Sequence, residues 1–383
     1  MRAVASLFIV PATIAATVAA CGTPAPPPVT PPPPPPPVPT VEPAPTSAAP
    51  APTAAPEPTA APAPPPPAAC PANMVLVEGE YCTEVEQTCV EEWWGKANKK
   101  RVCEKFDPAA TRCIGQRVKK RYCVDKYEWP NKEGERPEVM NRFHQAQVKC
   151  AALGKRMCTE SEWNFACEGP EMKPFPYGYT RDPLTCNGDH YYDSPDMKLV
   201  AKRDPTELAR LWKGVRSGSQ PGCKSDFGVF DMPGNADEVA ASEATGGHYP
   251  KYDSITTGGP WYSGVRNQCR PKVYTHDEGF YYYYLSFRCC AEPDGKPTEP
   301  RTPRQIAEGW SMGKVEGLAG FTVAAMKEKL AQKAEGKCTC DEKDITCKTM
   351  CGTLLGPGAK DTTKDVPRAR YDGKVKRGRF VVK

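Results

Sequence analysis

The chain has 383 residues, a formal net charge of +5 and 25% charged side chains. Its lysines and arginines are spread along the sequence, so no nucleic-acid partner is expected. Setting Cys21 aside, 18 of the 19 cysteines remain, and in an exported chain an even set favours disulfides. A bond between adjacent cysteines strains the peptide, so Cys289 and Cys290 are expected to reach different partners.

The first 20 residues, 1–20, predict a secretory signal peptide, because a basic Arg2 precedes an apolar stretch that ends in small residues. The segment VAAC at 18–21 resembles a bacterial lipobox, in which the cysteine is lipidated after cleavage. We therefore expect an exported protein anchored in the cell envelope by a lipid on Cys21. An ordinary secretory signal is the alternative. Gly22, rather than Asp, after the cysteine favours the outer membrane.

Residues 21–69 form a predicted linker after the signal peptide. It consists almost only of Pro, Ala, Thr and Val, with 23 prolines among residues 22–69. Such a segment cannot bury a core, so we expect a disordered, Pro-rich tether with much polyproline II conformation. At about 3.1 Å per residue it would reach up to roughly 150 Å, which would hold a folded domain away from the membrane surface.

Residues 70–123 are the predicted start of the folded domain. A short apolar strand at 74–77 is followed by five cysteines within 82–123. We interpret this stretch as a disulfide-pinned insertion or hairpin. A zinc site is the weaker alternative, because no two of these cysteines have the Cys-x2-Cys spacing.

Residues 124–290 are the predicted main globular unit. An apolar stripe indicates a helix over 141–154. A capping box of Thr159 and Glu162 predicts a second helix over 159–169. The remainder of the unit is rich in Gly, Pro, Asp and Tyr, so we expect short strands and long ordered loops there.

Residues 291–383 form a predicted C-terminal extension. An amphipathic pattern predicts one helix over 318–336. The basic tail at 368–383 is interpreted as a solvated end, with contact to anionic envelope polymers as the alternative. Two local disulfides are favoured over a four-thiolate metal site for four clustered cysteines: Cys338, Cys340, Cys347 and Cys351.

Several motifs occur in one order in the main unit: VDKYEWPN, GKRMCTESEWNFACEG, PYGY, FGVFDMPGNADEV, TGGPW, RNQCRP and LSFRCC. Together they resemble the sulfatase-modifying factor family, whose best-known members are formylglycine-generating enzymes. The resemblance implies an α+β fold of the C-type-lectin-like, formylglycine-generating type. Such a fold has little regular structure and many ordered loops.

The resemblance also implies where catalytic residues would lie. In the generating enzymes two cysteines after a Gly-Gly-Ser motif, with four residues between them, bind copper(I) and oxidise a substrate cysteine. Counted from the glycines at 258–259, these positions are Ser263 and Gln268, so copper is not expected. Cys269, one residue further on, is the candidate catalytic residue. It is interpreted as a disulfide partner, with a structural thiol and a reactive thiol as alternatives.

Calcium is the second feature that the resemblance implies. In the family, the loop that matches FDMPGNADEV binds one ion through side-chain and backbone oxygens. A tight turn capped by Asn235 is the alternative, because ADEV replaces two tryptophans of the family pattern and adds a charge. The positions that match the first and a second family site are Asp231, Gly234, Ala236 and Glu238, and Asn187 and Gly188.

Histidines and aromatic residues offer two further hypotheses. A histidine-based iron centre is a weak one, since the four histidines include no helical pair; His190 has two carboxylates nearby, Asp189 and Asp193. Aromatic rings gather in FYYYY at 280–284, with Trp261, Tyr262 and Tyr274. Outward-facing rings would form a platform for a peptide or sugar, and the alternative is that most rings belong to the core.

These observations predict an envelope-anchored lipoprotein whose formylglycine-generating-enzyme-like domain lacks the copper-binding pair. The domain would act as a binding or scaffold module for an envelope peptide, glycan or protein. Two alternatives stay open. One is an oxidase that modifies an exported protein through Cys269, and the other is a structural protein that bridges envelope layers.

Overall fold

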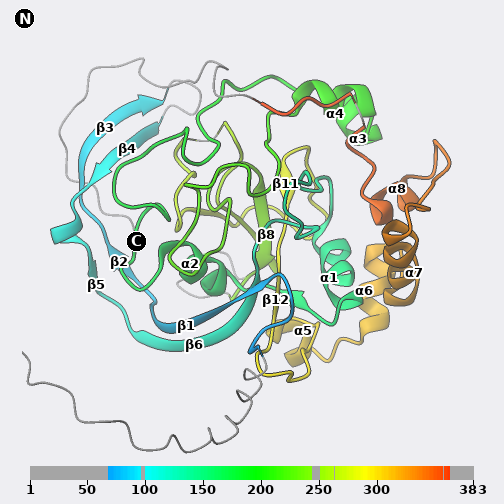
Figure 1. Cartoon of the computed structure of the whole chain (residues 1–383), viewed down its shortest axis with the longest axis horizontal. Coiled ribbons are helices and arrows are strands. Elements are labelled where there is room, and N and C mark those ends of the chain that lie inside the picture. The colour runs from blue at the N-terminus through cyan, green and yellow to red at the C-terminus, as the bar shows by residue number, and fades with distance from the viewer. Residues whose placement is uncertain (1–67, 96–99, 244–250, 263, 357, 363–383) are drawn as a thin grey trace, which may run out of the picture. The chain divides into compact units, whose positions relative to one another are not determined.

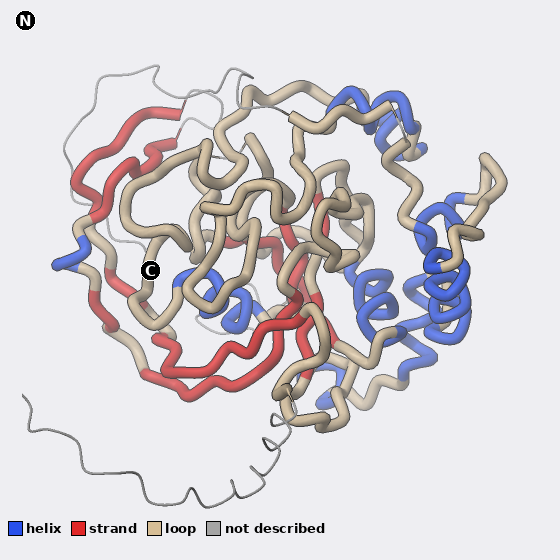
Figure 2. Tube along the Cα trace, viewed as in Figure 1, coloured by secondary structure: helices blue, strands red, loops and turns tan. Residues whose placement is uncertain are grey.

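The computed structural model describes residues 68–95, 100–243, 251–262, 264–356 and 358–362. The predicted signal peptide, Cys21, nearly all of the linker, Ser263 and the basic tail lie outside these residues. The described chain is α+β, as predicted, and much of it is loop (Figure 2). No helix in the described ranges is long and apolar enough to span a bilayer.

Two four-stranded sheets form the frame of the domain (Figure 1). The first is antiparallel, in the order β1-β6-β12-β7. The second has the order β10-β9-β8-β11, with β8 and β11 parallel. The strands of the first sheet are β1 (Met74–Cys82), β6 (Arg117–Asp125), β7 (Arg156–Met157) and β12 (Cys289–Ala291). Those of the second are β8 (Asp237–Ala241), β9 (Ser254–Thr257), β10 (Lys272–Val273) and β11 (Leu285–Ser286), which confirms the short strands predicted there.

The stretch 82–123 is a disulfide-pinned insertion with a hairpin, as predicted. Its elements are β2 (Val85–Glu86), β3 (Cys89–Gly95), β4 (Lys100–Phe106), the 3-10 helix η1 (Pro108–Ala110) and β5 (Arg112–Cys113). The hairpin of β3 and β4 is closed by a disulfide between Cys89 and Cys103. The bridge from Cys82 to Cys113 ties the insertion to the end of the long β1–β6 ladder.

Both helices predicted for the main unit are present. They are α1 (Phe143–Ala152) and α2 (Glu160–Glu168), and Thr159 with Glu162 forms the predicted capping box of α2. The sequence pattern missed two short helices, α3 (Met197–Lys202) and α4 (Pro205–Leu211). Each begins at an aspartate whose side chain accepts backbone N–H groups, a local signal too short to stand out in a loop-rich stretch.

The C-terminal extension contains α5 (Pro303–Ala307), α6 (Met312–Ala319), α7 (Val323–Ala334) and α8 (Ile345–Cys351), and α6 and α7 lie against α1 (Figure 1). The helix predicted over 318–336 is present as α7, but it begins later than predicted, at Val323. Gly320 ends α6 in the left-handed conformation, with φ +82°, and Thr322 caps the start of α7. The two predicted local disulfides are confirmed as Cys338–Cys351 and Cys340–Cys347.

The 18 cysteines after Cys21 form nine disulfides within the described residues. Cys289 bonds to Cys150 and Cys290 to Cys158, so the adjacent cysteines do reach different partners. Successive side chains of a strand point to opposite faces. Strand β12 therefore fastens two hydrophobic cores, one containing Cys150 and Cys289 and the other Cys158 and Cys290.

Candidate ligand-binding site

The loop that follows β9 (Ser254–Thr257) carries Ser263 and Gln268, the positions to which the resemblance assigns the catalytic cysteine pair. Asn267 holds this loop closed, because its Nδ2 donates to the carbonyl oxygens of residues 258–260 at 3.3, 3.1 and 2.9 Å. A Cβ on Gly259 would lie 2.8 Å from the Cβ of Arg266, so the two arms of the loop touch. Arg266 also pairs with Asp237 of β8, which fastens the loop to the second sheet.

Cys269, at the end of this loop, is bonded to Cys167 of α2. Its residue is 0% exposed, and its N–H donates to the Pro174 carbonyl at 2.9 Å. The structure therefore has the disulfide form of Cys269. A catalytic role is not supported by this geometry, because a buried bridge presents no thiolate and would first have to be reduced.

Gln268 occupies the other position that the resemblance assigns to copper. It is buried, and its Nε2 donates to the Val265 carbonyl at 3.4 Å. An amide is not the soft ligand that copper(I) prefers. The described part of this loop thus presents no thiol, and Ser263 lies outside it.

The turn that matches the family's calcium loop is buried and contains an unusual carboxylate. Asp231 is 1% exposed, and its Oδ2 accepts the Gly218 N–H at 2.8 Å. Its Oδ1 has no hydrogen-bond partner among the described residues. Burial raises the pKa of Asp231 to about 7. Gly234 has φ +94°, and a Cβ there would lie 2.8 Å from the Asn187 carbonyl oxygen, so the turn requires glycine.

The resemblance assigns Glu238 as the other side-chain ligand of that loop. In the structure, Glu238 is instead bound by Arg288. Its two oxygens accept from Arg288 at 2.6 and 2.7 Å, and one also accepts from Trp163 Nε1 at 2.9 Å. All three side chains are buried. Burial, and then the charges of Asp231 and Glu238, raise the pKa of the neighbouring Glu128 well above its usual range.

The predicted calcium ligands therefore come together only in part. Asn187 does lie beside Gly234, and its carbonyl oxygen accepts the Asn235 N–H at 2.8 Å. Ala236 is buried in the turn, and the Gly188 N–H donates to the Pro183 carbonyl at 3.2 Å. Asp231 offers an unpaired oxygen, but the oxygens of Glu238 already have partners. As arranged here, the loop does not present the full oxygen set that the resemblance implies.

The carboxylates near His190 are also engaged by cations. Asp189 is bound by Arg181 at 2.5 and 2.8 Å, and Asp193 pairs with Lys213 at 2.7 Å. His190 Nε2 lies 2.7 Å from Asn187 Oδ1 in the same segment, and Asn187 Nδ2 in turn donates to Asn235 Oδ1 of the other predicted calcium segment at 3.3 Å. These contacts indicate a structural role for the segment.

The aromatic residues of this region form an inner and an outer layer. Trp261 and Tyr283 are 1% and 2% exposed and belong to a hydrophobic core, as the core interpretation predicts for part of the set. Tyr274 is half-buried, with its hydroxyl 3.2 Å from Glu160 Oε2. The outer layer, which we call the tyrosine face, consists of Tyr192, Tyr262, Tyr282 and Tyr284.

Ring contacts connect the whole tyrosine face. The ring centroids of Tyr192 and Tyr262 are 5.0 Å apart, those of Tyr262 and Tyr284 5.5 Å, and those of Tyr282 and Tyr284 4.8 Å. Tyr192 is 43% exposed and the other three are half-buried. Burial raises the pKa of Tyr282 to about 12, so its hydroxyl stays protonated at neutral pH.

Sequence reasoning did not assign Tyr192 to this face. It comes from a loop about seventy residues before Tyr262 along the chain, and the fold brings the two together. The His190 N–H donates to the Trp261 carbonyl at 2.8 Å, which joins the two segments. The only sequence signal was the pair of tyrosines in HYYD directly after the predicted Asn187–Gly188 site.

Comparisons with solved structures give distant matches. The structure of CarF is 13% identical, with a TM-score of 0.35, and the match covers 58% of this chain and 98% of that chain. PvdO from Pseudomonas aeruginosa is 16% identical, with a TM-score of 0.34, and coverage of 57% and 93%. Treponema denticola variable protein 1 is 13% identical, with a TM-score of 0.34, and coverage of 57% and 95%. No curated protein matches the sequence.

The family comparison is more informative than these structures. The model of the sulfatase-modifying factor enzyme 1-like domain matches residues 79–293. This range is more than half of the 383 residues, and it includes both the disulfide-pinned insertion and every motif on which the resemblance was based. The fold is accordingly the α+β, formylglycine-generating type that those motifs predicted. The chain belongs to the sulfatase-modifying factor enzyme 1-like domain family.

Proposed function

We propose that this chain is an exported lipoprotein whose family domain binds an envelope ligand instead of oxidising cysteine. The anchor would be a lipid on Cys21, with the Pro-rich segment as a tether and the outer membrane as the location. The observation that carries the proposal is the disulfide of Cys269 with Cys167, beside a buried Gln268. Copper-dependent oxidation needs thiolates at this loop, and its described residues offer none.

The tyrosine face supports a binding role. Tyrosine rings give large contact areas at low conformational cost and keep a hydroxyl for hydrogen bonding. Tyr262 directly precedes Ser263, the position to which the resemblance assigns the first catalytic cysteine. A peptide or a glycan of the envelope is the ligand class that such rings suit.

A sedimentation assay with purified peptidoglycan tests this function, because peptidoglycan contains both peptide and glycan. The full-length protein should sediment with it. Tyr192→Ala should weaken binding about fivefold, since an aromatic contact contributes about 1 kcal/mol. Tyr191→Ala is the matched control, because Tyr191 is 53% exposed and its ring makes no ring contact with the tyrosine face among the described residues.

Two results would contradict the binding function. One is the same affinity for the wild-type chain and Tyr192→Ala. The other is copper-dependent formation of formylglycine in a cysteine-containing peptide, which would put the oxidase alternative first. Retention by the cell wall that is unaffected by Tyr192→Ala and lost on removal of 368–383 would favour the structural alternative.

Structural calcium remains part of the proposal because Asp231 has an unpaired, buried oxygen. Binding would require Glu238 to exchange Arg288 for the ion or to share its oxygens with both. Calcium should raise the unfolding temperature of the wild-type chain and leave that of Asp231→Asn unchanged. Scanning calorimetry with calcium and with a chelator makes the comparison. Equal unfolding temperatures for the wild-type chain in both solutions would refute the calcium site.

A further inference from the structure

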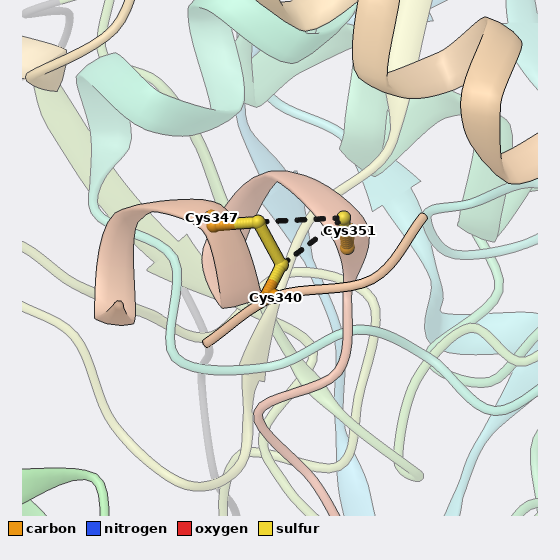
Figure 3. Close-up of side chains that lie close together, drawn as sticks. All are labelled: Cys340, Cys347 and Cys351. Carbon is orange, nitrogen blue, oxygen red and sulfur yellow. Dashed lines mark hydrogen bonds between the residues drawn. A yellow bond between two sulfur atoms is a disulfide. The ribbon is translucent and has the colours of Figure 1, made fainter. Parts of the chain in front are cut away.

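The four cysteines of the C-terminal extension form one sulfur cluster rather than two separate bridges. Cys340 Sγ lies 3.4 Å from Cys351 Sγ, which belongs to the other disulfide. Cys347 Sγ lies 4.0 Å from the same atom (Figure 3). The sulfurs of the two disulfides are therefore in van der Waals contact.

The distances between the two bridges match those of a metal–thiolate site. A zinc–sulfur bond is about 2.3 Å, so two thiolates on a tetrahedral zinc lie about 3.8 Å apart. The observed separations of 3.4 and 4.0 Å lie on either side of this value. Within the described ranges, Cys340, Cys347 and Cys351 are the only group of three or more Cys, His, Asp or Glu ligand atoms all within 4.8 Å of one another. Cys338 Sγ is bonded to Cys351 Sγ but lies outside this group of three, so it would have to move closer to serve as the fourth ligand.

Helix α8 presents two of the sulfurs independently of the disulfides. Cys347 and Cys351 are four residues apart, one helical turn, so they share a face, and both are buried. Asp344 caps the helix, with its Oδ1 accepting the Cys347 N–H at 2.9 Å. Cys340 reaches this face from the loop before the helix (Figure 3). The framework of the cluster is thus formed by helix signals that persist when the bridges open.

We propose that this cluster is a redox-controlled site for zinc, held by four thiolates. Each disulfide takes two electrons and two protons from a dithiol reductant, which closes to its own disulfide, so two equivalents give four thiols. Zinc then displaces the four thiol protons and binds Cys338, Cys340, Cys347 and Cys351. When oxidised, the segment is held by two bridges, and when reduced, it is held by the metal.

Access favours reduction at this cluster over reduction of the Cys167–Cys269 bridge of the family domain. Cys338 and Cys340 are half-buried, whereas both cysteines of the Cys167–Cys269 bridge are buried. A thiol must reach a sulfur atom to open a bridge. The bridge from a half-buried Cys70 to Cys123 gives a control with similar access on one side and no second pair of sulfurs beside it.

The test uses the full-length protein, a limited treatment with dithiothreitol, and zinc as the probe. One zinc should bind per chain, and alkylation followed by mass spectrometry should find the four cluster cysteines protected only when zinc is present. Cobalt(II) in place of zinc should give the sulfur-to-metal charge-transfer absorption of a thiolate site. Circular dichroism before reduction checks that each variant is folded.

A pair of matched variants decides the result. Cys340→Ser with Cys347→Ser removes two ligands and should lose the bound zinc, while the Cys338–Cys351 bridge still closes the loop before reduction. Cys70→Ser with Cys123→Ser should keep the zinc. The proposal is overturned if the reduced wild-type chain binds no zinc, or if the first variant binds as much as the wild-type chain.

Discussion

The family domain and the C-terminal extension hold their chains together in different ways. In the domain, the bridges Cys150–Cys289, Cys158–Cys290 and Cys167–Cys269 span 139, 132 and 102 residues. In the extension, the two bridges span 13 and 7 residues, beside four short helices. A loop-rich domain has few regular backbone ladders to fix its shape. Long-range covalent links and buried ion pairs fulfil that task, whereas the extension depends on local helix signals.

The two regions meet at a buried carboxylate. Lys149 of α1 and Lys333 of α7 donate to Glu138 at 2.6 and 2.7 Å. Burial by itself would raise the pKa of Glu138, but the two lysines bring it below its ordinary value. The extension is therefore attached to the domain by charge as well as by apolar contacts between α6, α7 and α1.

The largest expected effect comes from removing both bridges that reach β12. Alanine at Cys150, Cys158, Cys289 and Cys290 opens rings of about 10 and about 30 residues, because Cys167–Cys269 stays closed, and should cost about 6 kcal/mol of unfolding free energy by the chain-entropy estimate. Cys340→Ala with Cys347→Ala opens a loop of 7 residues and should cost about 2 kcal/mol. Denaturant unfolding without reductant measures both. Equal losses would contradict the distinction between the two regions.

Breaking a buried ion pair of the domain should lower the free energy of unfolding nearly as much. Arg288→Met leaves Glu238 without its partner in the interior, close to Glu128, and should cost about 3–5 kcal/mol. Arg304→Met in the extension breaks a solvent-exposed pair with Glu308 and should leave the free energy of unfolding nearly unchanged. Thermal unfolding of the two variants gives the comparison, and a loss below 1 kcal/mol for Arg288→Met would refute the buried role.

A smaller effect on stability, one that depends on pH, is expected at a contact between the domain and the extension. Asp253 of the domain contacts the Thr302 hydroxyl, which caps α5, at 2.9 and 3.0 Å, and burial raises its pKa to about 6. Because the folded pKa is the higher one, the protonated form favours folding. This contribution is complete below about pH 4 and is lost as the pH rises through 6. Stability measured from pH 4 to 8 should fall about 1–2 kcal/mol more for the wild-type chain than for Asp253→Asn. If the stability of both proteins changes with pH in the same way, Asp253 does not make this contribution.

The parts predicted from sequence are those with local signals. The capping box at Thr159 predicted α2, and the apolar stripe predicted α1. In the extension the periodicity predicted α7 but placed its start too early, because residues 320–322 form a break in which Gly320 ends α6 and Thr322 caps α7. The motifs led to the correct family, because residue types at fixed spacing carry that information.

The candidate site was harder to predict, because its contacts join distant segments. Nothing in the local sequence pairs Cys269 with Cys167, and disulfide connectivity depends on the completed fold. Glu238 has the residue type of a calcium ligand, yet Arg288, fifty residues later, occupies its oxygens. Tyr192 joins Tyr262 in the same way, through tertiary packing that no period in the sequence encodes.

The most direct test of the account is the state of Cys269 in the natively exported protein. The protein would be alkylated without reductant, digested, and examined by mass spectrometry. The account predicts a peptide in which Cys269 is linked to Cys167, with no alkylated Cys269 and no binding of copper(I). An alkylated Cys269 that copper(I) protects would contradict it and would make the oxidase the leading function.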